Sequence, residues 1–207
     1  MSITLPTLQN FSAFTQTEII GSISLVFLGL ICAVFTAFYC SREFRGDRKK
    51  TVLVFAGITL LITLSLISFF GFSATAIRGV ILCLTLAFCS CSDIKTRECP
   101  DYPYIIIAVA AFIGIELTAL PGMLFGAFSV FVIQFYGAWV TRATLNGADL
   151  KLSTACAFLL GTTHGILGLL IGMLLGIIVN LFRSRDTKAG FPLIPYLAVG
   201  FMAAYFL

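Results

Sequence analysis

Long runs of apolar residues separated by short polar stretches dominate the chain. Backbone polar groups inside lipid must be satisfied within their own segment, so runs approaching the roughly 20 residues that cross hydrocarbon are predicted to be helices. Continuous rather than alternating apolar residues argue against a membrane β-barrel. The pattern therefore predicts an all-α, polytopic transmembrane helical bundle. Eight hydrophobic segments can be distinguished, at residues 18–40, 51–72, 74–92, 104–120, 122–140, 150–161, 164–182 and 192–207.

The sixth segment is the shortest, with residues 150–161. A helix of this length rises roughly 18 Å, which is less than the roughly 30 Å of a hydrocarbon core. It either dips partway into the bilayer or continues beyond Gly161 toward Gly165. The connections between segments are too short to hold a soluble domain, so residues 1–207 are predicted to form a single integral membrane domain. The first 17 residues contain no Lys or Arg, so the first segment is expected to be a retained anchor.

Composition and charge agree with a membrane protein. Hydrophobic residues make up 59% of the chain and charged residues 11%, with a mean hydropathy of +1.07, which leaves too few polar residues to coat a soluble domain. The net charge of +4 is carried by short loops rather than by one basic surface, so no nucleic-acid partner is predicted. The only partner implied at this stage is the lipid bilayer.

The basic residues also predict an orientation. Of the 13 Lys and Arg residues, all but Arg78 fall on one set of alternate loops. Lys and Arg are enriched in cytoplasmic loops, so those loops are placed in the cytoplasm and both termini outside it, in the inner or plasma membrane. This assignment requires that the sixth and seventh segments together cross the bilayer twice.

Two aspartates are predicted at the same cytoplasmic depth although they lie far apart in sequence. Asp93 ends the third segment, and Asp149 opens the sixth, at a helix N-terminus where free N–H groups favour a carboxylate. Two carboxylates brought together at low dielectric cannot both ionise easily, so one is expected to hold a proton. One could then act as a base on water while the other donates to a carbonyl. Gly147 leaves room for close backbone approach at this point.

Simpler interpretations apply to the same residues. An Asp beside Lys or Arg at the end of a span is often a topology anchor or a helix cap. Glu116, expected inside the fourth segment near its outer end, is a weaker functional candidate. Cys89, Cys91 and Cys99 do not have zinc spacing and lack a fourth ligand, so neither a metal nor a cofactor is predicted. A stripe of small residues suits close helix contact, either with a substrate helix or within the bundle: Gly168, Gly172 and Gly176.

Three stretches of the chain resemble the type IV prepilin peptidases, a family of membrane aspartyl proteases that includes the archaeal preflagellin peptidases. "SDIKTRECPDY" (92–102) resembles the first motif of the family, an Asp followed by basic residues and a Pro. "NGADLKL" (146–152) resembles the second, Gly-x-Gly-Asp followed by x-Lys, and "FPLIPYLAVG" (191–200) resembles the Pro-rich start of the last span. The resemblance covers roughly residues 74–207.

By this resemblance the protein is an aspartic endopeptidase that cleaves the leaders of prepilin-like proteins at the cytoplasmic face. The implied catalytic residues are Asp93 and Asp149, and the implied supporting residues are Gly147, Lys151, Lys95 and Pro100. Asn146 and Ala148 replace the two glycines of the strict second motif. The loop at 41–50 is too short for the N-terminal domain that long bacterial members carry and that is associated with methylation. The chain therefore resembles the short, peptidase-only members.

Two other functions remain open at this stage. A small transporter or channel subunit would use the same acids to bind an ion or proton, and polar residues would then continue across the bundle. Between Asp149 and the outer face the sequence offers mainly Ser153, Thr154 and Thr162. An inactive assembly factor with the same fold would explain the departures at Asn146 and Ala148.

Overall fold

The computed structural model describes residues 16–43, 48–97, 99–141, 147–182 and 192–207. Asn146, Phe191 and the basic residues at 45, 142, 183, 185 and 188 lie outside the described residues. The regular elements within the described ranges are helices, as the sequence predicts. They are α1 (Gln16–Glu43), α2 (Arg48–Phe70), α3 (Ala74–Thr96), α4 (Tyr102–Ala110), a short 3-10 turn η2 (Leu117–Ala119), α5 (Leu120–Thr141), α6 (Gly147–Phe182) and α7 (Ile194–Tyr205).

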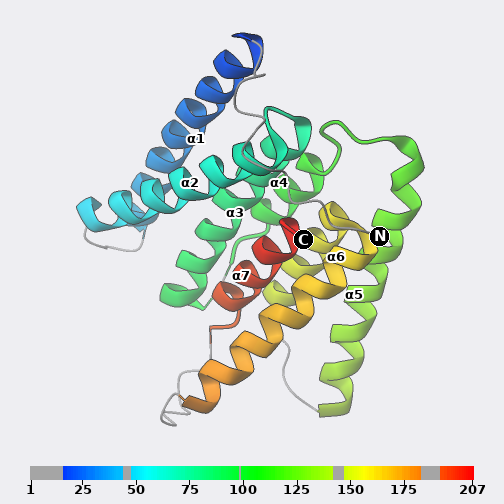
Figure 1. Cartoon of the computed structure of the whole chain (residues 1–207). Helices are drawn as coiled ribbons and strands as arrows, with labels where there is room; N and C mark the ends of the chain where they lie inside the picture. Colours follow the sequence, from blue (N-terminus) through cyan, green and yellow to red (C-terminus); the bar gives the residue numbers. More distant parts are fainter. Residues whose placement is uncertain (1–15, 44–47, 98, 142–146, 183–191) are drawn as a thin grey trace.

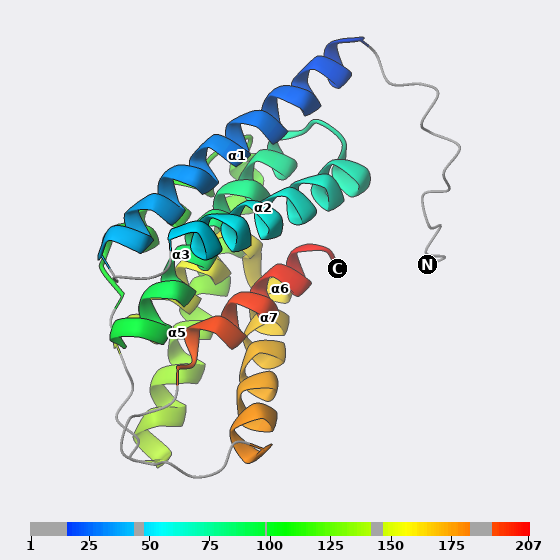
Figure 2. The ribbon, with the colours of Figure 1, turned by 90° about the vertical axis from the view of Figure 1, so that its left-hand side faces the viewer.

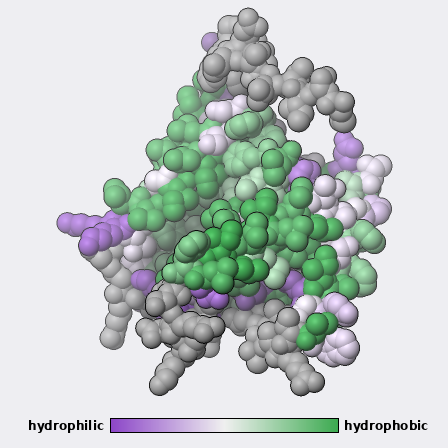
Figure 3. All heavy atoms as spheres, turned by 60° about the horizontal axis from the view of Figure 1, so that its bottom comes forward, coloured by the Kyte–Doolittle hydropathy of each residue, from purple (hydrophilic) through white to green (hydrophobic). Residues whose placement is uncertain are grey.

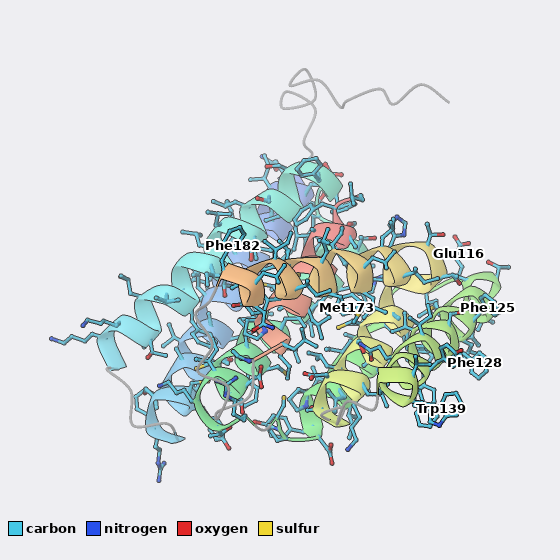
Figure 4. All side chains as sticks on the ribbon, turned by 90° about the horizontal axis from the view of Figure 1, so that it is seen from below. Glu116, Phe125, Phe128, Trp139, Met173 and Phe182 are labelled. Atoms are coloured by element: carbon cyan, nitrogen blue, oxygen red, sulfur yellow. The ribbon has the colours of Figure 1, made fainter. Side chains whose placement is uncertain are left out.

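Five of these helices, α1, α2, α3, α5 and α6, are long and apolar enough to cross a membrane. Their outer surfaces are hydrophobic, and apolar side chains cover most of the face seen in Figure 3 while hydrophilic ones gather toward its edges. From α5, the side chains of Phe125, Phe128 and Trp139 point away from the bundle (Figure 4) and are 62%, 65% and 72% exposed. Exposed aromatic rings of this kind are costly in water and suit lipid. The chain is a multi-pass helical membrane protein.

The sixth and seventh hydrophobic segments belong to one element, so the described residues form seven α-helices rather than the eight separate segments predicted. This element, α6, is interrupted at Gly161, whose φ of 77° lies in the left-handed region that favours glycine. Beyond the break, a Cβ placed on Gly165 would lie 2.9 Å from the Cα of Ala157, eight residues earlier. Eight residues of straight helix would separate these positions by roughly 12 Å, so the second arm of α6 folds back against the first.

The helix in the fourth hydrophobic segment is shorter than predicted, so Glu116 lies outside it. We expected one span over residues 104–120, but α4 ends at Ala110 and a turn follows, with Gly114 at a φ of 64°. Pro121 then sits at the second position of α5, where a missing N–H costs nothing. Glu116 lies in the connection before η2 and is exposed, so the prediction that it sits inside a span is wrong.

Helix α3 is central to the arrangement. It contacts the hairpin of α1 and α2 on one side and packs against α4 and α7 on the other, while α5 packs on α6 at the far side of the bundle (Figures 1 and 2). Helix α7 runs antiparallel along α3. Its first residue, Ile194, bonds to Asp93 near the end of α3, and the hydroxyl of Tyr205 near its end donates to the carbonyl of Thr75 at 2.6 Å. Both ends of α7 are thus fixed to α3.

The small-residue stripe of α6 serves packing within the bundle. A Cβ on Gly168 would lie 3.1 Å from the Cα of Phe201, and one on Gly172 would lie 2.7 Å from the Cα of Leu197, both in α7. Gly200 of α7 faces the backbone of Gly168 and Gly172 in return. The contact between α6 and α7 is therefore backbone against backbone, and α7 covers this part of the stripe from any substrate helix.

We predict that Gly200→Ala destabilises the protein by about 1–3 kcal/mol, because the new methyl group meets helix backbone that cannot rotate away. The matched control is Gly57→Ala on α2, where a Cβ meets nothing within 4 Å. That change should be neutral or stabilise by up to roughly 1 kcal/mol through helix propensity. Thermal unfolding in lipid or detergent measures both. Equal melting temperatures for the two variants would contradict the close α6–α7 contact.

Candidate active site

Asp93 is buried in the last turn of α3, with 3% of its surface exposed. The helix ends just beyond it at Arg97, which adopts the left-handed conformation (φ 62°) and donates its backbone N–H to the carbonyl of Asp93 at 3.1 Å. This conformation costs a residue with a Cβ roughly 1–2 kcal/mol. The guanidinium of Arg97 also lies near enough for its charge to act on the Asp93 carboxylate.

The side chain of Asp93 is held by the start of α7. The backbone N–H of Ile194, the first residue of α7, donates to Oδ2 of Asp93 at 3.1 Å. No side chain next to it in sequence caps α7, and Pro195 follows at the second helical position. The first N–H groups of a helix have no partner inside the helix and carry partial positive charge. A carboxylate from α3 therefore caps α7 at the start of its Pro-containing first turn.

Asp149 lies in the first turn of α6, as the sequence predicts, and only 7% of its surface is exposed. Its Oδ1 is buried and accepts no hydrogen bond from the described part of the chain. Leaving a buried acceptor unpaired costs roughly 1–3 kcal/mol. Such unpaired atoms are rare in native proteins and call for an explanation at the site where they occur.

The structure brings the two aspartates together. Their side chains are close enough for the charge of Asp93 to act on Asp149, and Cys99 senses the charges of both. The pair combines the end of α3, the start of α6 and the start of α7. Two carboxyl groups buried at one place, one held by a backbone N–H and one with an unpaired oxygen, can bind water and share a proton.

A buried polar pair next to Asp149 escaped the sequence analysis. Ser153, one turn after Asp149, is fully buried, and its hydroxyl lies 2.6 Å from Oε1 of Gln134 on α5 and 2.7 Å from the carbonyl of Asp149. Gln134 is 5% exposed. The pair ties α5 to the turn that carries Asp149. The sequence did offer one signal for this pair. Gln134 is an amide inside a predicted span, and polar side chains inside spans need hydrogen-bond partners.

The predicted supporting residues divide into separate environments. Lys151 pairs with Asp101 at 2.7 Å, linking the first turn of α6 to the loop before α4, but both side chains are more than half exposed and such a pair contributes at most about 1 kcal/mol. Lys95 is exposed at the end of α3, and Pro100 is half-buried in the loop that follows. A Cβ on Gly147 would meet nothing within 4 Å, so no other backbone segment approaches this position closely.

The three cysteines considered as metal ligands point to different partners. The thiols of Cys89 and Cys99 are within hydrogen-bonding reach of each other, whereas Cys91 faces Cys40 of α1. Among the residues that the structure describes, no group of three or more His, Cys, Asp and Glu side chains gathers in a way that could hold a metal ion.

A partly polar hollow of about 610 Å³ lies at the end of the bundle opposite the aspartates, beside the break in α6. Arg78, Glu116 and His164 line it, and Glu116 is seen at the rim of the bundle in Figure 4. It is separated from the aspartates by the length of the first arm of α6, from Asp149 to Gly161. These three ionisable residues are therefore not part of the aspartate site.

The helices form a polytopic membrane bundle with two buried aspartates near one end. A model of the type IV leader peptidase family matches residues 80–181, a range that contains both aspartates. Over these residues the chain belongs to this family, and the family implies a peptidase. Comparisons with curated proteins and with solved structures found no match.

We predict that Ser153→Ala destabilises the protein by roughly 1–3 kcal/mol, because it leaves the buried Gln134 amide without this partner. The double variant Gln134→Leu/Ser153→Ala should lose less than the sum of the two single changes, and a double-mutant cycle on unfolding free energies measures this coupling. Ser65→Ala, which removes a more exposed hydroxyl on α2, is the control and should stay within about 0.5 kcal/mol. A cycle without coupling would contradict the pairing.

Proposed function

We propose that the protein is a membrane-embedded aspartic endopeptidase that removes leader peptides from type IV prepilin-like proteins at the cytoplasmic face of the cell membrane. One observation carries this proposal: Asp93 and Asp149 are both buried, and their side chains are near enough for the charge of Asp93 to act on Asp149. The family supplies the general activity, and the carboxylate pair supplies the chemistry.

The mechanism uses water as the nucleophile. One carboxylate takes a proton from a water held between the two side chains, and the oxygen of that water attacks the carbonyl carbon of the scissile peptide bond. The other carboxyl group donates its proton to the carbonyl oxygen. The tetrahedral intermediate then collapses, the C–N bond breaks, and the leaving amine takes up a proton from the pair. No metal or cofactor takes part in these steps.

The hydrogen bonds distinguish the two aspartates. The N–H of Ile194 and the nearby Arg97 stabilise negative charge on Asp93. Asp149 has a buried oxygen without such a donor. This asymmetry favours Asp93 as the base that activates water and Asp149 as the acid that protonates the carbonyl oxygen.

The position of the pair suits a substrate that lies partly in the membrane. The aspartates sit near the ends of apolar helices, beside the loops whose basic residues predict a cytoplasmic location. A prepilin-like substrate has a short basic leader followed by an apolar helix, so its cleavage site lies at the same boundary between water and lipid. Lys151, Lys95, Pro100 and Gly147 then belong to the surroundings of the pair in supporting roles.

We predict that Asp93→Asn and Asp149→Asn each lower the rate of leader cleavage by roughly 10²–10⁴-fold or more, because each removes one half of the acid–base pair. The measurement uses purified protein in lipid vesicles, a prepilin-like substrate, and sequencing of the new N-terminus of the product. Glu116→Gln, an acid-to-amide change at the opposite end of the bundle, should cleave normally. Normal processing by both Asn variants would overturn the proposal.

We also predict that the cleavage rate falls at both low and high pH. At low pH both carboxyl groups are protonated and no base remains, whereas at high pH both are ionised and no acid remains. A pH profile of kcat/KM for the unaltered protein tests this expectation. A rate that stays constant across the range in which carboxyl groups titrate would argue against a shared-proton mechanism.

A further inference from the structure

A groove of about 770 Å³ runs along the side of the bundle between α2 and α7. Helix α3 packs against both of these helices and forms the floor of the groove. The lining is hydrophobic over almost its whole length. Representative side chains are Cys83 and Ala87 on the floor, Ile58 and Ile62 on the α2 wall, and Val199 and Met202 on the α7 wall.

One end of the groove lies beside the contact between Asp93 and Ile194. Ile94, which follows Asp93, lines it on α3, and Pro195, which follows Ile194, lines it on α7. The same two residues, Asp93 and Ile194, share the hydrogen bond that caps α7. A chain segment lying in the groove would therefore leave it beside the last turn of α3, which carries Asp93.

Two lysines indicate the membrane depth of the end of the groove near Asp93. Lys50 of α2 and Lys95 of α3 both line the groove at the end near Asp93. Lysines concentrate where spans meet the cytoplasm, and their long side chains reach from the apolar region to water. The groove thus extends from the interface at Lys95 into the hydrocarbon. From Lys95 back to Cys83 the floor of α3 covers about three helical turns, roughly 18 Å.

We propose that this groove binds the apolar transmembrane helix of the substrate and so delivers the scissile bond to Asp93 and Asp149. The inference rests on the proposed function, because it takes the substrate to have such a helix. The stripe of glycines on α6 offers no comparable surface, since α7 covers Gly168 and Gly172. The groove offers an apolar surface on the other side of α7, and its end lies beside the contact between Asp93 and Ile194.

Photo-crosslinking locates the substrate directly. The protein carries Asp149→Asn so that bound substrate stays intact, and a photoreactive amino acid replaces either Val199 in the groove or Ile177 on α6. These two side chains are 57% and 55% exposed, so they are matched in access. We expect adducts with the apolar helix of the substrate at Val199, at least several-fold more than at Ile177. Equal yields, or lipid adducts alone at Val199, would overturn the proposal.

Filling the groove separates this inference from the proposed function. Ala87→Trp places an indole on the floor, and Leu174→Trp, at an outward position of α6 that is 59% exposed, is the control. Two substrates are compared: the full prepilin-like protein and a short peptide that spans the cleavage site but lacks the helix. We expect Ala87→Trp to lower the ratio of protein cleavage to peptide cleavage at least tenfold, through a higher KM for the protein.

The outcomes are distinct. If the unaltered protein cleaves neither substrate, the proposed function fails. If it cleaves both, and Ala87→Trp leaves the ratio at the value of Leu174→Trp, the groove is not the docking site although the peptidase assignment stands. Should Ala87→Trp fail to insert, the crosslinking yields at Val199 and Ile177 still decide the question.

Discussion

One hydrogen bond, from the N–H of Ile194 to the carboxylate of Asp93, organises the site on which the account depends. It satisfies the start of α7, which has no side-chain cap nearby in sequence, and it places negative charge at the positive end of that helix. It also joins residues 101 positions apart in the chain. Since hydrogen bonds to charged groups contribute about 1.5–3 kcal/mol, a single contact both stabilises the bundle and orients one of the two carboxylates that we propose as catalytic.

The remaining helices support this contact by geometry. The break at Gly161 folds the second arm of α6 back, and α7 then lies against glycine positions of that arm closely enough for the backbones to touch. At the other end of α7, Tyr205 bonds to the start of α3. The start of α7 is therefore fixed against the end of α3 at Asp93, whose charge acts on Asp149 at the start of α6. On the opposite side of α7, the groove along α3 ends beside the same turn of α3.

Hydropathy predicted the helical class and most helix positions, because lipid requires backbone groups to bond within each segment. It could not predict that α4 ends at Ala110, since the apolar residues continue through the turn to Leu120. The aspartates stood out as acids beside apolar runs. The partners of the buried polar groups could not be predicted. The N–H that bonds to Asp93 and the amide that bonds to Ser153 come from helices distant in sequence, and their positions depend on how those helices pack. The glycine stripe predicted close contact, but only the structure identified α7 as its partner.

We propose that Asp93 and Asp149 lie close enough to hold one water molecule between them. A cryo-electron microscopy map of the protein in a lipid nanodisc, at a resolution that defines side chains, measures this most directly. We expect both carboxyl groups at one membrane depth, on the side of the basic loops, near enough for one water to bond to both. Carboxyl groups on opposite leaflets, or too far apart for a shared water, would contradict it.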